Sequence, residues 1–238
     1  MFRFLNLKYN YLIYGILICK FAPMDQEQLE NLREEYKSAS LSESTTKNDP
    51  LKQFETWFNE AQEANVPERN SMMLATATND GRPSARVVLL KGVNEYGFIF
   101  YTNYLSRKGK EITKNPVGAL TFFWPSMERQ IRIEGTIEKL NKEQSDKYFH
   151  SRPKNSQIGA VVSPQSQEIE SRDILEKKWS ELAEEYIDKE VPKPSFWGGY
   201  ILKPRMIEFW QGRSSRLHDR IAYKKIDNKN WKKVRLAP

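Results

Sequence analysis

A run of basic residues near the C-terminus has the types and spacing to bind an anion or an electron-rich ring. Arg216, His218 and Arg220 are spaced by two and follow a turn marked by Gly212, Ser214 and Ser215. If that run is extended, all three side chains leave on one face. Charges placed in this way repel each other unless something anionic or electron-rich lies against them. The alternative is a solvated edge strand, and this run alone favours that reading.

A second basic cluster opens a predicted helix. Ser106-Arg107-Lys108 comes shortly after Tyr101-Thr102-Asn103, where a strand ends in hydrogen-bonding groups. Cations at a helix N-terminus oppose the helix dipole, but they suit a phosphate that docks on the free backbone N–H groups. This local conflict favours a phosphate site. The alternative is a surface helix with unfavourable charge placement.

A third cluster, between Tyr148 and Ser156, indicates a separate anion site. Tyr148 and Arg152 lie one helical turn apart and share a face. Ser156 is placed to cap the next helix and to donate to an anion. Lys91 ends an apolar strand and is a candidate fourth donor. The alternative is an ordinary helix end followed by a proline turn.

Composition excludes several classes of function. The chain has 238 residues, a net charge of +7 and interspersed acids and bases, so a nucleic-acid-binding tail is not expected. One cysteine excludes an internal disulfide and fits a reducing compartment. Two histidines and one cysteine are too few for a His/Cys metal site, so we expect no metal. Neither G-x-G-x-x-G nor a P-loop occurs, which disfavours a doubly wound nucleotide-binding fold.

Hairpin-linked strands with helices between them position these clusters. Asp49-Pro50 starts an amphipathic helix over residues 50–64, and Asn79-Asp80-Gly81 indicates a hairpin. The sequence predicts strands at 71–78, 84–91, 97–103, 117–124, 130–140, 199–202, 205–211, 219–226 and 231–236, and further helices at 106–114, 141–150, 156–162 and 171–187. We therefore expect a mainly β, antiparallel α+β fold with peripheral helices that closes as a barrel.

The distribution of apolar, polar and charged residues divides the chain into three segments. Residues 50–238 form the predicted domain, and residues 24–49 form a flexible lead-in or lid with a short helix over 26–38. Residues 1–23 form an extension without acidic residues, whose apolar run Tyr11–Cys19 is too short to span a bilayer. That extension is a targeting segment or is dispensable. We expect a cytoplasmic protein with no stable membrane insertion, and a mitochondrial one if residues 1–23 act as a presequence.

Together the motifs resemble those of the pyridoxine/pyridoxamine 5′-phosphate oxidase family. The matching runs cover about residues 30–238 and stand in the family's order. They include Pro83-Ser84-Ala85-Arg86, Tyr101-Thr102-Asn103, Ser106-Arg107-Lys108, Tyr148-Phe149-His150-Ser151-Arg152-Pro153, Phe196-Trp197-Gly198-Gly199, Ile207-Glu208-Phe209-Trp210-Gln211-Gly212, Arg216-Leu217-His218-Asp219-Arg220 and Arg235-Leu236-Ala237-Pro238. Each motif alone is weak, whereas the set is specific.

The resemblance implies an FMN-binding split β-barrel that works as a homodimer with FMN at the subunit interface. The residues implied to hold FMN are Arg86, Val87, Val88, Leu89, Tyr101, Thr102, Arg107, Lys108, Gln130, Gln165, Ser166, Trp210 and Arg220. Those implied to bind the substrate are Lys91, Tyr148, Arg152, Ser156, Arg216, Leu217, His218, Arg33 and Tyr36. Arg216 and His218 are the implied catalytic residues, which place the substrate ring against the flavin.

The implied reaction is oxidation of pyridoxine 5′-phosphate or pyridoxamine 5′-phosphate to pyridoxal 5′-phosphate, a step of vitamin B6 salvage. Hydride passes to FMN, and O₂ is the final acceptor and gives hydrogen peroxide, with ammonia released from the amine. One alternative is a non-catalytic flavin- or haem-binding split barrel, since this fold hosts several functions. Another is a basic RNA-binding barrel, which predicts exposed aromatics interleaved with Lys and Arg on strands. The presence of the whole substrate set argues against the non-catalytic alternative.

Overall fold

The computed structural model describes residues 26–32, 35–227 and 230–238, in two units. The N-terminal unit ends at Glu34 and contains the helix α1 (Gln26–Asn31), which is shorter than the helix predicted over 26–38. Residues 1–23 and Arg33 lie outside the described residues. None of the helices in the described part of the chain is long and apolar enough to span a membrane.

The second unit, residues 35–238, combines nine strands with five α-helices and two short 3₁₀ turns among the described residues. In chain order they are α2 (Pro50–Glu63), β1 (Ser71–Ala77), β2 (Pro83–Leu89), β3 (Gly92–Asn94), β4 (Gly97–Asn103), α3 (Arg107–Lys114), β5 (Val117–Trp124), η1 (Pro125–Met127), β6 (Arg129–Lys139), α4 (Lys142–Ser151), α5 (Lys154–Val162), α6 (Arg172–Glu185), β7 (Trp197–Gln211), η2 (Ser214–Arg216), β8 (Asp219–Lys225) and β9 (Trp231–Leu236).

All strand pairs are antiparallel, in the order β2-β1-β5-β6-β7-β4-β3, and β8 and β9 continue from β7. The two edge strands of this order, β2 and β3, follow each other in the chain and are joined by Leu90 and Lys91. Because β2 pairs with β1 and β3 pairs with β4, the sheet must curl to bring these edges together. The N–H of Lys91 donates to the carbonyl of Ile99 at 2.8 Å and starts that second pairing. One chain segment therefore joins the two edges of the sheet, and the expected antiparallel barrel is confirmed.

The strand β7 is a single element of 15 residues, whereas the sequence predicted two strands separated at Lys203-Pro204. The register against β6 shifts between Glu134 and Gly135, so the chain passes the proline through a bulge. A Cβ on Gly135 would lie 2.0 Å from the carbonyl oxygen of Lys203, so only glycine fits there. This continuous strand contributes residues to both ends of the sheet.

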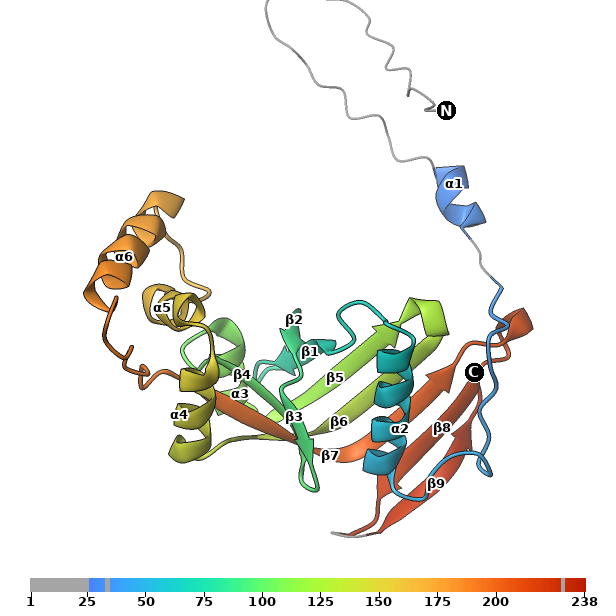
Figure 1. Cartoon of the computed structure of the whole chain (residues 1–238). Coiled ribbons are helices and arrows are strands. Elements are labelled where there is room, and N and C mark those ends of the chain that lie inside the picture. The colour runs from blue at the N-terminus through green and yellow to red at the C-terminus, as the bar shows by residue number, and fades with distance from the viewer. Residues whose placement is uncertain (1–25, 33–34, 228–229) are drawn as a thin grey trace, which may run out of the picture. The chain divides into compact units, whose positions relative to one another are not determined.

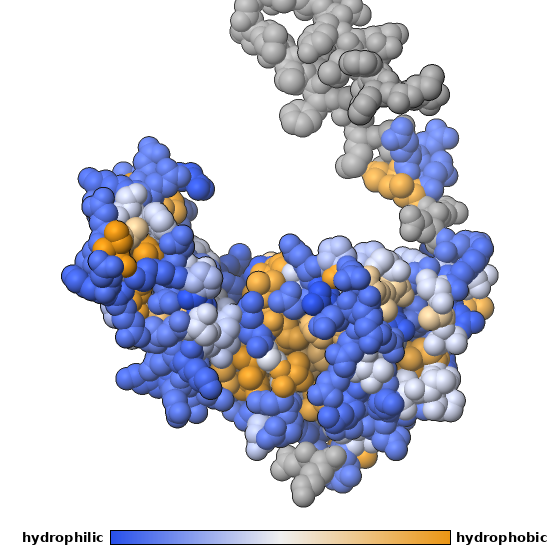
Figure 2. Space-filling view, in the orientation of Figure 1, coloured by the Kyte–Doolittle hydropathy of each residue, from blue (hydrophilic) through white to orange (hydrophobic). Residues whose placement is uncertain are grey.

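The helix α2 packs its aromatic face on the barrel core, as predicted. Asp49 caps it by accepting from the N–H of Leu51 at 2.8 Å. Phe54 lies with its ring centroid 4.9 Å from that of Phe98, and Trp57 lies 5.2 Å from Phe209. In Figure 2 hydrophobic residues gather beside α2, and hydrophilic residues cover α2 itself.

The remaining helices gather at one end of the sheet, whereas β8 and β9 lie at the other (Figure 1). Ser106 caps α3 by accepting from the N–H of Gly109, and Asn141 caps α4 by accepting from that of Gln144, as predicted. The next helix, α5, begins two residues before Ser156, so Ser156 lies in its first turn and the predicted capping role is wrong. The helix α6 buries no residue and lies within the helix predicted over 171–187.

Candidate functional site

One cavity of about 660 Å³ lies among β2, β4, α3, α4, α5 and the start of β7. It gathers eleven of the side chains that the sequence singled out: Val87, Val88, Leu89, Lys91, Tyr101, Thr102, Lys108, Tyr148, Arg152, Ser156 and Gln165. We call this set the cavity group. Its members come from β2 and the residues after it, the end of β4, the helices α3, α4 and α5 and the loop after α5, and they lie up to 78 residues apart in the chain. Its volume is in the range of small-molecule sites.

Lys108 carries a buried positive charge into the cavity. Its side chain comes from the first turn of α3, and the residue is 8% exposed. The ammonium donates to the hydroxyl of Thr102 at 3.3 Å and to Oε1 of Gln165 at 3.1 Å. No carboxylate among the described residues pairs with it, and burial, followed by the nearby charge of Arg86, lowers its pKa. A buried cation with only neutral partners is a favourable place for an anion.

The two arginines predicted beside Lys108 are instead held by Glu111, a buried acid that sequence reasoning missed. Its carboxylate accepts from Thr76 at 2.5 Å, Ser84 at 2.6 Å and Nε of Arg107 at 2.9 Å, and Nη2 of Arg86 lies 3.4 Å away. Burial raises the pKa of Glu111, but these donors outweigh burial and bring it to about 2. Glu111 therefore stays ionised and holds both guanidinium groups, neither of which lines the main cavity.

A smaller part of the predicted set lines a neighbouring cavity of about 660 Å³ beside the β1–β2 hairpin. Arg107 and Ser166 line it, together with Lys110, Lys114 and Glu111. Ser166 has a φ of 70°, a left-handed conformation that turns the chain after Gln165. The predicted phosphate cradle is thus divided between two adjoining cavities.

The third basic cluster lines the same cavity as Lys108. Tyr148 stacks on Tyr101 with ring centroids 3.8 Å apart. Arg152 donates through Nη2 to the carbonyl of Ser156 at 2.7 Å, while its Nη1 is buried without a hydrogen-bond partner. An orphaned buried donor is rare and marks a place for a missing acceptor. Lys91 lines the same cavity without a carboxylate partner among the described residues.

The other predicted residues form a second set, the strand-end group, at the far end of β7. Gln130, Trp210 and Arg220 face each other in register across β6, β7 and β8, so their side chains leave on one face of the sheet. Arg220 donates from Nε and Nη2 to the buried carboxylate of Glu208 at 2.8 and 3.1 Å. That bidentate pair fixes the orientation of the guanidinium.

The turn after β7 completes the strand-end group. The indole of Trp210 lies 4.6 Å from the imidazole of His218, and Tyr36 packs 5.8 and 5.9 Å from those two rings. Nδ1 of His218 accepts from the backbone N–H of Arg213 at 3.1 Å, so the neutral ring carries its proton on Nε2. Nε2 is therefore the donor that this histidine can offer to a ligand.

Arg216 does not lie on an extended run with His218 and Arg220. Ser215 and Arg216 adopt φ values of 56° and 60° within η2, so the chain turns here and the predicted shared face is wrong for Arg216. The left-handed residues reverse the chain before β8 and leave Arg216 and Leu217 exposed. No carboxylate in the described part of the chain pairs with Arg216, so its charge is available to a ligand.

The two groups lie at opposite ends of the same strand. Trp197, at the start of β7, lines the cavity, and Trp210, near its end, belongs to the strand-end group. At about 3.3 Å a residue, roughly 40 Å of extended chain separates them, although curvature shortens the direct distance. Among the described residues, no member of the strand-end group is among the side chains that line the main cavity.

Sequence reasoning also missed Trp197, whose indole lines the cavity. Its position before two consecutive glycines was the available signal, since paired glycines mark a close approach of other groups to the backbone. Glu111 gave no such signal, because at four residues from Arg107 it matches an ordinary surface ion pair of a helix.

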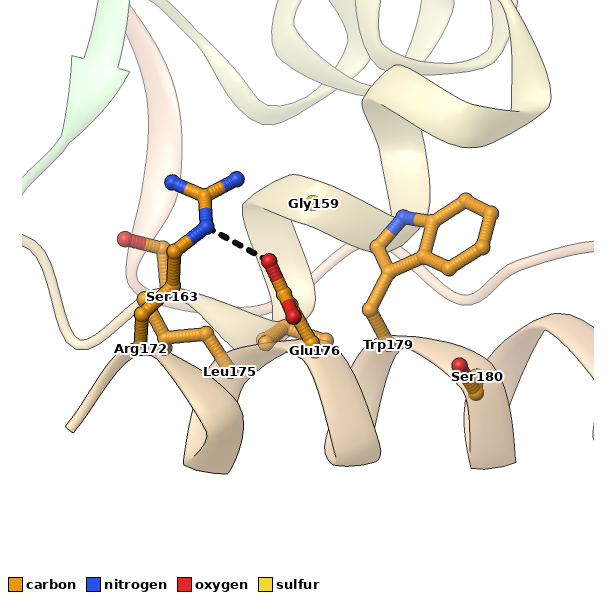
Figure 3. Close-up of a pocket in the computed structure, with 8 residues that line it drawn as sticks. Gly159, Ser163, Arg172, Leu175, Glu176, Trp179 and Ser180 are labelled. Carbon is orange, nitrogen blue, oxygen red and sulfur yellow. Dashed lines mark hydrogen bonds and ion pairs between the residues drawn. The ribbon is translucent and has the colours of Figure 1, made fainter.

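A further cavity of about 480 Å³ lies between α5 and α6 (Figure 3). Trp179 of α6 lies beside Gly159 of α5, and Arg172 and Glu176 form an ion pair at 2.5 Å along the same helix. Gly159 and Ser163 line both this cavity and the main one. None of the side chains predicted to bind a ligand lines it.

Comparison with known proteins agrees with the geometry. Residues 58–185 match a family model described as pyridoxamine 5′-phosphate oxidase, and residues 197–238 match one described as the pyridoxine 5′-phosphate oxidase C-terminal dimerisation region. The chain is 52% identical over 213 residues to the pyridoxine/pyridoxamine 5′-phosphate oxidase of Salinibacter ruber, covering 89% of this chain and 99% of that protein. It is 52% identical to that of Rubrobacter xylanophilus, covering 90% and 98%.

The solved structures include PhzG from Burkholderia lata in complex with tetrahydrophenazine-1-carboxylic acid. It superimposes with a TM-score of 0.79 at 32% identity and covers 85% of this chain and all of that one. A pyridoxamine 5′-phosphate oxidase-related, FMN-binding protein from Nostoc punctiforme has a TM-score of 0.63 at 16% identity, which shows the shared fold. The chain is therefore an oxidoreductase that belongs to the pyridoxine/pyridoxamine 5′-phosphate oxidase family.

Proposed function

We propose that the protein oxidises pyridoxamine 5′-phosphate and pyridoxine 5′-phosphate to pyridoxal 5′-phosphate, with FMN as cofactor and O₂ as final acceptor. The observation that carries this proposal is the charge pattern of the main cavity. Lys108 and Arg152 both line it: Lys108 is buried, Arg152 is half-buried with a buried Nη1, and neither has a carboxylate partner among the described residues. Two separate uncompensated cations match two phosphates, one on the cofactor and one on the substrate.

The residues around Lys108 fit the phosphate of FMN. Thr102 and Gln165 lie within hydrogen-bond distance of the ammonium, and Glu111 holds Arg86 and Arg107 beside it. The strand β2 pairs only with β1 in the described sheet, so backbone groups along its other edge face the cavity. Such groups are suited to the polar edge of a planar ring system. FMN held by these residues would supply a hydride acceptor and a route for the electrons to O₂, with hydrogen peroxide as the product.

The substrate phosphate fits the other side of the cavity, among Lys91, Tyr148, Arg152 and Ser156. Arg152 offers its unpaired Nη1, and Lys91 adds a second cation. Each charge-assisted bond to a phosphate is worth roughly 1.5–3 kcal/mol. These contacts bind and orient the substrate so that its reacting carbon lies near the flavin.

A second copy of the chain supplies what one copy lacks, so we propose a homodimer with the cofactor at the interface. The strand-end group of one copy would close over the cavity group of the other. Val87, Leu89, Met73 and Phe123 form an apolar outer face across β2, β1 and β5 and are 42–60% exposed. Phe123 pairs with Gln130, so this face adjoins the strand-end group. The match to a dimerisation region supports that assembly.

In this assembly the strand-end group works on the substrate ring. Arg216, exposed and without a carboxylate partner in the described chain, stacks on the pyridine and holds it against the flavin. His218 donates from Nε2 to a polar substituent of that ring, because its Nδ1 is already engaged by Arg213. Both residues orient the substrate, and neither is required as a nucleophile.

The test is oxygen uptake by the purified chain with each phosphorylated substrate, with and without added FMN. We expect a yellow protein that consumes O₂ with either substrate and forms pyridoxal 5′-phosphate. A colourless protein that FMN cannot reconstitute would contradict the assignment. Turnover of a reduced phenazine carboxylic acid in place of both vitamers would instead favour a function directed at the kind of ligand that PhzG binds in its complex.

A further inference from the structure

Trp197 lies beside the main cavity, nearly parallel to the stacked rings of Tyr101 and Tyr148, whose centroids are 3.8 Å apart. Its indole is 5.6 Å from the ring of Tyr101 at an interplanar angle of 13°, and 6.2 Å from that of Tyr148 at 7°. Phe149 meets it edge-on at 5.2 Å. Trp197 is 7% exposed and lines the cavity. The ring of Tyr148 is therefore held by close stacking on Tyr101, with the more distant Trp197 nearly parallel to both rings.

The same indole supports Arg152. Cζ of Arg152 lies 4.7 Å from the centroid of the Trp197 ring and 5.8 Å from that of Phe149. The single hydrogen bond of this guanidinium goes to the carbonyl of Ser156, and its Nη1 has no partner. Burial lowers the pKa of Arg152, a sign that water solvates this charge poorly. The indole is thus the main contact that sets the plane of the guanidinium.

Two glycines set the position of the rings. A Cβ on Gly199 would lie 2.8 Å from Cε1 of Tyr101, and a Cβ on Gly198 would lie 2.2 Å from the hydroxyl of Tyr104. Gly199 is also the cross-strand partner of Tyr101. The Trp-Gly-Gly segment therefore lets Tyr101 and Tyr104 approach the backbone of β7 closely while Trp197 projects beneath Arg152.

An aromatic support differs from a carboxylate support in one respect that matters for an anion site. A carboxylate would fix Arg152 but would neutralise its charge and repel an incoming phosphate. The π-face of an indole attracts and orients a guanidinium and leaves its net charge and its outer N–H groups free. The arrangement keeps Arg152 both ordered and fully charged.

We propose that Trp197 is a positioning residue for the substrate phosphate, acting through Arg152 and Tyr148. This inference rests on the proposed function, in which those two residues bind that phosphate. Trp197 need not touch the substrate itself. Its contribution is confined to ligands that carry the phosphate.

The test compares Trp197→Leu and Trp197→Phe with wild type, using pyridoxamine 5′-phosphate and unphosphorylated pyridoxamine at saturating FMN. For Trp197→Leu we expect KM for the phosphorylated amine to rise roughly tenfold, the size of a lost desolvated cation–π contact, with kcat nearly unchanged. For unphosphorylated pyridoxamine we expect kcat/KM to stay within about twofold of wild type. Trp197→Phe keeps a weaker π-face, so we expect a rise in KM of about two- to threefold.

Inorganic phosphate, added as a competitive inhibitor, gives a second readout. Its inhibition constant should be lowest for the wild type, higher for Trp197→Phe and highest for Trp197→Leu. Trp179→Leu is the matched control, because Trp179 lines the cavity between α5 and α6 (Figure 3), whereas the cation–π contacts of Arg152 among the described residues go to Trp197 and Phe149. That control should leave KM for both amines unchanged.

Equal losses with both amines in Trp197→Leu would show a general structural role and overturn the proposal. An unchanged KM and phosphate inhibition constant in Trp197→Phe and Trp197→Leu would also overturn it. If Trp197→Leu does not fold, the KM values and the phosphate inhibition constant of Trp197→Phe test the proposal. A wild-type protein that takes up no oxygen with the phosphorylated amine would instead show that the proposed function is at fault.

Discussion

Lys108 donates from Nζ to Oε1 of Gln165 at 3.1 Å, a bond that joins the first turn of α3 to the loop after α5. Gln165 also accepts from the hydroxyl of Thr102 at 3.1 Å, so its oxygen is fully engaged. Its amide NH₂ is thereby directed away from the lysine. In the proposed function, the ammonium and this amide are the donors that would bind the cofactor phosphate.

Replacing Lys108 by Met should weaken FMN binding more than replacing Arg107 does. Lys108 is buried and uncompensated, so we expect the dissociation constant of FMN to rise roughly 10- to 100-fold. The side chain of Arg107 is 63% exposed and is paired with Glu111, so Arg107→Met should raise the dissociation constant of FMN only about threefold. Quenching of flavin fluorescence on titration measures both values. Lys110→Met, an exposed change on the same helix, is the control, and an equal loss there would refute a specific role for Lys108.

Replacing Arg216 by Ala should slow turnover and leave FMN bound. Arg216 lies in the exposed turn after β7, apart from the cavity group that holds the phosphates. Poor positioning of the reacting carbon can cost on the order of 100-fold in kcat/KM. Steady-state oxygen uptake gives the rate, and the flavin absorbance of the purified variant gives the occupancy. Purification of Arg216→Ala without flavin would mean that this residue holds the cofactor instead.

Replacing Glu111 by Gln should lower stability in a pH-dependent way. The pKa of Glu111 is depressed from 4.5 to about 2, so its contribution is complete above about pH 4.5 and is lost as pH falls towards 2. That contribution is on the order of 2–3 kcal/mol at pH 7, or roughly 5–10 °C in Tm. Thermal unfolding of both proteins between pH 7 and pH 3 measures the difference. A gap in Tm that stays constant over that range would assign the loss to packing and not to ionisation.

Mixing two inactive variants should restore activity if the site is shared between copies. Arg152→Met damages the cavity group, and Arg216→Ala damages the strand-end group. A mixed dimer places both changes in one site and leaves its other site intact. Random assortment should therefore restore about a quarter of wild-type activity, since half of the dimers are mixed and each keeps one good site. Refolding or coexpressing the two chains together, followed by an oxygen-uptake assay, tests this. Activity no higher than that of the separate variants would indicate a site built within one copy.

The sequence predicted local structure well where local rules decide it. Asp49, Ser106 and Asn141 cap the helices expected of them. The eleven side chains of the cavity group lie too far apart in the chain for a local rule to bring them together, and several of them were implied only by the family resemblance. The sequence-based predictions were wrong where the backbone conformation depends on more than the pattern of residue types. The extended run at Arg216 is broken by two left-handed residues, which the alternation of residue types does not reveal.

The division into two groups was also invisible in the sequence pattern. It depends on β7 running unbroken past Pro204 through a bulge against Gly135, whereas Pro204 on its own predicted a strand break. The roles of Glu111 and Trp197 depend on partners from other elements, such as Ser84 and Arg152. Position in the chain does not disclose such contacts.

The length of β7 also has a consequence for how the protein behaves on dilution. If two copies of the chain bind each flavin, flavin binding and subunit association are thermodynamically linked. Each process then raises the equilibrium constant of the other by the same factor. Lowering the protein concentration then releases flavin by mass action, and excess flavin draws separated subunits back together. The oxidase would in this way release its flavin and dissociate into single subunits over the same range of protein concentration.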